Sequence, residues 1–287
     1  MGIDIQWPLV LFTLFSGIGA GLLVPAGLAE LTGKRNQKAQ TVALIASLAL
    51  LIVGGCFSLL HLEAPQNVMA AVYNIFSFSG ISMELILLGA CCIVAFVFLI
   101  AVKRGAGSGA LKAIGIIGII VAALLMYFCG HGYIMPSKPA WDTEMLPIAY
   151  FGSSLAGGVF AYGVVLGASS AQTDEVKVYR VVALVGAIIC ACACALYCIA
   201  VMAYVTEGAA VAFWGGLVVC GIVLMLIVGV ITYLKLAPGN LTAIAVAGLV
   251  VAVIAILAVR VVMWCTSEGY LEMFSLAANA SPYVSIL

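Results

Sequence analysis

Eight runs of apolar residues constrain the fold of this chain more than any other feature. A helix needs about 20 apolar residues to cross a hydrocarbon core of about 30 Å. Hydrophobic residues make up 66% of the 287 residues and charged residues only 8%, against roughly a quarter in soluble domains. We therefore predict an all-α membrane protein with eight transmembrane helices and a single integral membrane domain, residues 1–287. The predicted spans lie near 7–31, 41–62, 83–102, 113–133, 146–169, 181–205, 209–234 and 241–265.

Basic residues are distributed unevenly between the two ends of these spans. Nine of the eleven lie in the four loops that follow the odd-numbered spans: Lys34, Arg35, Lys38, Lys103, Arg104, Lys112, Lys177, Arg180 and Lys235. Because positively charged loops stay in the cytoplasm, we expect both termini on the outer, periplasmic face of a bacterial inner membrane. A division into spans one to four and five to eight would give two four-helix bundles.

The predicted outer face carries the remaining polar features. Four tryptophans fall at outer span boundaries, where indole rings prefer to lie: Trp7, Trp141, Trp214 and Trp264. The longer connecting segments, near 63–82 and 134–145, also lie on this side. Function is therefore expected there. The middle of each span lacks charged residues, which argues against the charge-lined path of an ion-coupled transporter.

The ten cysteines lie inside or at the edges of the spans and form no C-x-x-C motif. Buried cysteines commonly serve as small apolar side chains, so we expect no iron–sulfur cluster and no metal site within this chain.

The end of span two and the start of span three bring a base and an acid to the outer face. His61 falls in the last turn of span two, because Pro65 cannot continue the helix. Glu84 opens span three, and a helix N-terminus favours a carboxylate. A base and a carboxylate beside lipid suit a quinol, since each of its two hydroxyls loses a proton as electrons leave. An ordinary interfacial histidine and a helix-start glutamate are the other interpretation of this spacing.

Two further residues are candidates for chemistry. His131 ends span four and could in principle ligate one haem axially together with His61; neither lies deep in a span, and we expect no haem. Arg260 lies about 28 Å along span eight at 1.5 Å per residue, near the outer boundary. We expect it to snorkel, to stack on Trp264, or to pair with an outer carboxylate such as Glu84 or Glu207.

Several short motifs occur along the chain in a fixed order. They are Trp7-Pro8-Leu9 before Phe12-Thr13, His61-Leu62-x-x-Pro65, Asn74, Glu84, Pro139-x-Trp141 and Arg260. Together they resemble the membrane anchor subunit of bacterial anaerobic dimethyl sulfoxide reductase over essentially the whole chain. The resemblance implies a haem-free anchor that oxidises menaquinol at the outer face. Electrons would pass to an iron–sulfur subunit and from it to a molybdopterin catalytic subunit, both docked outside.

The resemblance also assigns site residues. His61 and Glu84 match the family positions tied to quinol binding and are the expected catalytic pair. Glu63 stands where the family usually has glycine, and Asn67 stands where a basic residue is often found, so quinol contacts can differ here. The further expected contacts are Glu63, Asn67, Trp141, Arg260 and His131. Two other functions stay open: a quinone-linked subunit of polysulfide-reductase type, able to run in the reverse direction, and a small-molecule transporter.

Overall fold

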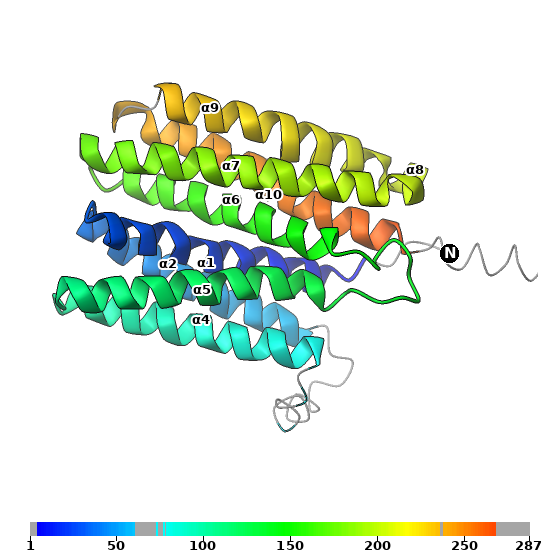
Figure 1. Cartoon of the computed structure of the whole chain (residues 1–287), viewed down its shortest axis with the longest axis horizontal. Helices are drawn as coiled ribbons and strands as arrows, with labels where there is room; N and C mark the ends of the chain where they lie inside the picture. The colour runs from blue at the N-terminus through cyan, green and yellow to red at the C-terminus, as the bar shows by residue number, and fades with distance from the viewer. Residues whose placement is uncertain (1–4, 61–72, 74–76, 78, 236–237, 268–287) are drawn as a thin grey trace, which may run out of the picture.

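The computed structural model describes residues 5–60, 73, 77, 79–235 and 238–267, and these residues contain helices and no strands. Eight helical segments are long and apolar enough to cross a membrane. They run roughly parallel or antiparallel to one another (Figure 1). Their elements are α1 Trp7–Thr32, α2 Gln37–Leu60, α4 Gly80–Lys103, α5 Ser108–His131, α6 Met145–Gly167, α7 Thr173–Val201, η3 Met202–Tyr204, α8 Glu207–Ala210, η4 Val211–Leu224, α9 Met225–Lys235, η5 Pro238–Asn240 and α10 Leu241–Cys265.

All eight predicted spans are confirmed, but several helices begin earlier than hydrophobicity alone indicates. The clearest case is α7, which starts at Thr173, eight residues before the predicted span. Gln172 and Glu175 form a capping box there, with the Gln172 N–H donating to Glu175 Oε2 at 2.8 Å. Reciprocal caps satisfy backbone groups that the first turn leaves unpaired. The helix therefore extends into polar sequence beyond its apolar segment.

The seventh span changes helix type along its length. It begins as α8, continues as the π-helix η4 and ends as α9. A π-helix this long is unusual, since most are single-turn bulges. Its glycines bring the neighbouring helices close: a methyl group on Gly216 would overlap Ala258 of α10, and one on Gly221 would lie 2.9 Å from Cys194 Sγ of α7.

The helices form two groups of four, as Figure 1 shows: α1, α2, α4 and α5 lie on one side, and α6, α7, α8–α9 and α10 on the other. The groups meet where α1 crosses α6, and these two helices are the most buried of the eight spans. A Cβ on Gly21 would lie 2.6 Å from the Ser154 carbonyl oxygen, and one on Gly158 would overlap the Gly21 backbone. Glycines at such crossings allow close backbone approach.

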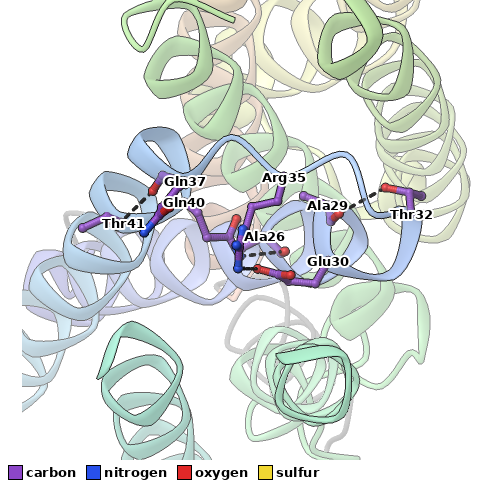
Figure 2. Close-up of polar contacts among 8 residues, drawn as sticks. All are labelled: Ala26, Ala29, Glu30, Thr32, Arg35, Gln37, Gln40 and Thr41. Atoms are coloured by element: carbon purple, nitrogen blue, oxygen red, sulfur yellow. Dashed lines mark hydrogen bonds and ion pairs between the residues drawn. The ribbon is translucent and has the colours of Figure 1, made fainter. Parts of the chain in front are cut away.

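At one end of the bundle, hereafter the basic end, the loops and the adjoining parts of the helices carry the nine basic residues named above. Figure 2 shows the polar contacts between α1 and α2 there, where Gln40 Nε2 donates to the Ala26 carbonyl at 3.0 Å and Arg35 pairs with Glu30 at 3.2 Å. Asn36 Nδ2 donates to Glu175 Oε2 of α7 at 3.1 Å. These contacts tie the α1–α2 loop to both groups of helices.

Candidate functional site

The opposite end of the bundle, hereafter the cavity end, contains a cavity of about 380 Å³. Small-molecule sites typically occupy 300–1,000 Å³ and are largely apolar with a few polar groups. Two charged side chains are among its lining residues, Glu84 and Lys138. The full lining is Gln6, Leu9, Phe12, Ser58, Leu59, Gly80, Ile81, Glu84, Leu85, Leu88, Gly132, Tyr133, Met135, Lys138, Trp141 and Trp264.

Glu84 reaches the cavity because the start of α4 packs against the end of α5. Ser79 caps α4 by accepting a hydrogen bond from the Ser82 N–H at 3.4 Å. A Cβ on Gly80 would lie 3.0 Å from Gly132 Cα, and one on Gly132 would lie 3.0 Å from Glu84 Oε1. The Glu84 carboxyl therefore lies beside backbone that only glycine permits at this distance.

The predicted electrostatic reason for Glu84 is wrong. The helix begins at Gly80, three residues before the predicted start, and no acidic residue falls in its first turn. The helix dipole acts mainly within that turn, so it does not account for a carboxylate at Glu84. Among the described residues, no cation lies within 4.0 Å of this carboxyl. A partly exposed acid facing a cavity, without an ion-pair partner, can accept or release a proton to a ligand.

Trp141 and Trp264 form one wall of the cavity and are buried, at 2% and 9% exposed. Trp141 Nε1 donates to the Met263 carbonyl at 2.7 Å, and the two indoles pack edge to face with centroids 5.3 Å apart. Tyr133 packs against both rings. Of the four tryptophans predicted at outer span boundaries, Trp7 and Trp214 are exposed at this end, whereas Trp141 and Trp264 are packed inside the protein.

Arg260, one turn before Trp264 on α10, is completely buried. It does not snorkel to the surface, stack on Trp264 or pair with an outer carboxylate, so all three predicted arrangements are wrong. Its Nε donates to Thr13 Oγ1 at 2.9 Å, and Nη2 donates to the Thr13 carbonyl at 3.2 Å and to Ser154 Oγ at 3.4 Å. Nη1 donates to the Ile256 carbonyl at 3.0 Å, and the guanidinium lies 4.1 Å from the Tyr150 ring centroid.

No carboxylate among the described residues pairs with Arg260. Hydroxyls, carbonyls and an aromatic face therefore replace the expected acid, because α1 and α6 bring them to this depth. Arg260 does not line the cavity, but Trp264, one turn further along α10, does.

His131 ends α5 as predicted but does not line the cavity. Its ring stacks on Tyr127 and meets Phe128 edge to face, at centroid distances of 5.7 and 5.4 Å. The Nδ1 atom is buried with no hydrogen-bond partner among the described residues. Tyr127 in turn donates to Glu144 Oε2 at 2.7 Å. The other predicted contacts, His61, Glu63 and Asn67, and the motif residue Asn74 lie outside the described residues.

The cysteines of α7 lie on more than one face of their helix. Cys190, Cys194 and Cys198 are buried and Cys192 is exposed, all as free thiols. Within the part of the chain that the structure describes, no three His, Cys, Asp or Glu side chains gather in a way that could hold a metal ion.

Sequence reasoning missed Tyr133, Lys138 and Trp264 as cavity residues. One signal was available for Lys138, because it is a basic residue on the side that the charge distribution assigns to the outside. For the two aromatic residues the sequence offers no comparable signal, since the cavity joins segments more than a hundred residues apart.

The chain matches the model of a known family. The family model described as "DMSO reductase anchor subunit (DmsC)" matches residues 1–264. No curated protein matches the chain.

Proposed function

From the premise that this chain belongs to the DMSO reductase anchor subunit (DmsC) family, we propose that it binds menaquinol in the cavity and oxidises it. Family membership and eight apolar helices together make the chain a multi-pass membrane anchor, associated with other subunits of a reductase complex. The observation that carries the proposal is the cavity itself. It is largely apolar, of a size suited to a quinol ring, and bordered by the Glu84 carboxyl, which forms no ion pair with any described residue.

The reaction removes two electrons and two protons from the quinol, leaving the quinone. Glu84 accepts one of these protons from a ring hydroxyl, because it is the acid among the described residues of the cavity lining. His61 accepts the other; an imidazole with an ordinary pKa near 6.5 takes a proton at neutral pH without a large penalty. It follows Leu60, the last residue of α2, and Ser58 and Leu59 of that helix line the cavity.

The electrons pass to an iron–sulfur subunit and then to a molybdopterin subunit, both docked at the cavity end. We propose that this end faces the periplasm, since the opposite end carries nine basic residues. Protons then leave on the outer side. The chain itself needs no haem for this role, and a purified complex is expected to lack a Soret band.

The test replaces Glu84 with glutamine in the complete complex and compares two electron donors. The variant Glu84→Gln is expected to lose about 10²-fold in quinol-driven turnover, the usual contribution of a positioned acid or base. Turnover driven by a reduced dye that feeds the partner subunits directly should not change. His61→Gln should behave in the same way.

The matched control is Glu144→Gln. Glu144 lies at the same end and accepts the Tyr127 hydrogen bond, but it does not line the cavity. It should keep normal quinol turnover. Normal quinol turnover and normal affinity for a quinol-analogue inhibitor in both Glu84→Gln and His61→Gln would refute the proposal.

A further inference from the structure

Lys138 is the cation among the described residues that line the cavity, and the backbone holds it there. It lies in the segment between α5 and α6, where its N–H donates to the Met135 carbonyl at 3.0 Å. Its own carbonyl accepts hydrogen bonds from the N–H groups of Trp141 and Asp142, at 2.8 and 3.0 Å. These bonds fold the segment into a turn, so Lys138 has a defined place at the cavity.

The ammonium group of Lys138 lies 3.7 Å from the centroid of the Trp141 ring. Trp141 is itself fixed, because its indole N–H donates to Met263 of α10. A cation over a tryptophan face is stabilised by the ring quadrupole. The lysine therefore points along the aromatic wall of the cavity instead of extending into solvent.

No carboxylate neutralises this charge within the part of the chain that the structure describes. Asp142 lies one turn further on and is exposed, yet no ion pair joins it to Lys138. The Glu144 carboxylate instead accepts the Tyr127 hydroxyl. Burial lowers the pKa of Lys138 from its ordinary value, as expected for an ammonium removed from water without a counter-charge.

Oxidation of a quinol creates negative charge on a ring oxygen. When the first proton leaves, the oxygen becomes a quinolate. Loss of one electron and of the second proton then gives a semiquinone anion, and loss of the second electron gives the quinone. A fixed cation beside that oxygen stabilises both species, and it does so more strongly in an apolar cavity than in water. Glu84 cannot serve this purpose, because a carboxyl group is negative before it accepts the proton and neutral afterwards, and is never positive.

We propose that Lys138 contacts the quinol and stabilises the anionic oxygen that forms on its ring during oxidation. This inference rests on the proposed function and adds a second polar contact to the same cavity. Glu84 takes the proton from one hydroxyl and Lys138 holds the oxygen that becomes negative. The second proton leaves through His61, and the two electrons leave to the iron–sulfur subunit.

The test uses the complete complex in membrane vesicles with a short-chain naphthoquinol as electron donor. Three variants separate charge from shape: Lys138→Gln and Lys138→Met remove the cation, and Lys138→Arg keeps it. Lys177→Gln is the matched control, because Lys177 makes an exposed ion pair with Asp174 at the basic end.

We expect Lys138→Gln and Lys138→Met to lower naphthoquinol-driven kcat about 10²-fold, the scale of losing one stabiliser of a developing oxyanion. The semiquinone signal in an electron paramagnetic resonance titration should fall in parallel. Lys138→Arg should stay within a few fold of the unchanged protein, and Lys177→Gln should match it. Dye-driven turnover in all four variants should remain normal.

Normal kcat, KM and semiquinone signal in both neutral variants would overturn the inference. Equal losses in Lys138→Arg and Lys138→Met would overturn it too, since the charge would then not matter. If either result for the Lys138 variants were found while Glu84→Gln lost quinol-driven turnover, the proposed function would stand and only the role of Lys138 would fail. Normal quinol turnover and unchanged inhibitor binding in both Glu84→Gln and His61→Gln would instead refute the proposed function.

Discussion

Replacing the buried Arg260 with methionine should destabilise the protein by about 1–4 kcal/mol. The side chain makes three hydrogen bonds to other helices, two to Thr13 and one to Ser154. Interhelical hydrogen bonds in membranes contribute about 0.6 kcal/mol on average and at most about 1.7. The contact with the Tyr150 ring adds about 2 kcal/mol for a desolvated cation. Removing a buried positive charge from the membrane interior offsets about 3 kcal/mol of this loss.

A double-mutant cycle isolates the contact between Arg260 and Tyr150. The single variants Arg260→Met and Tyr150→Leu are combined, and unfolding is followed in mixed micelles with a rising fraction of sodium dodecyl sulfate. The two changes should cost about 2 kcal/mol less together than the sum of their separate effects, because each alone removes the same cation–π contact. Tyr150→Phe, which keeps the ring, should stay within about 1 kcal/mol of the unchanged protein.

The reasoning fails if the coupling between the two sites is zero within error. It also fails if Arg260→Met is more stable than the unchanged protein, because the hydrogen bonds to Thr13 and Ser154 would then not repay the cost of the buried charge. Either result would mean that Arg260 is retained for another reason than stability.

Three further predictions follow from the packing, the charge distribution and Lys138. Gly158→Ala should prevent stable folding or lower the free energy of unfolding by at least about 1–3 kcal/mol, measured by thermal unfolding, because the methyl group would overlap Gly21. The control Gly215→Ala should be neutral, because a Cβ there meets nothing within 4 Å. A periplasm-dependent reporter fused to the C-terminus should be active; activity only from a cytoplasm-dependent reporter would reverse the orientation. The pKa of Lys138 is lower in the folded state than its ordinary value of 10.5. Between these two pKa values the unfolded state binds more protons than the folded state, so the free energy of unfolding should rise with pH. This rise should be absent in Lys138→Met. The same pH dependence in that variant would contradict a lowered pKa of Lys138 in the folded protein.

Much of the fold could be predicted because hydrophobicity alone specifies where a chain can cross a membrane. The eight spans and the gathering of nine basic residues at one end follow from local sequence. Helix ends were less predictable, since caps such as Gln172 with Glu175 extend helices beyond the apolar segment.

The site was predictable only where its residues stand out locally. Glu84 is an acid at the edge of an apolar span, and Trp141 lies in a recognisable motif, so both could be found. The surroundings of Arg260 could not be predicted, because its partners Thr13 and Ser154 lie far away in the sequence and are ordinary hydroxyl residues. Lys138 is noticeable as an outer cation, but its position over Trp141 depends on how the α5–α6 segment folds against α10.

The most direct test of the central claim is photolabelling with a reactive naphthoquinone, followed by mass spectrometry of the labelled peptides. The cavity assignment predicts saturable labels on the start of α4, near Ile81 and Leu85, and on the segment that carries Tyr133 and Trp141. An unlabelled naphthoquinone should compete with these labels, and Glu84→Gln should weaken them. Saturable labelling confined to the basic end, around the cavity of about 20 Å³ lined by Tyr162, would contradict it.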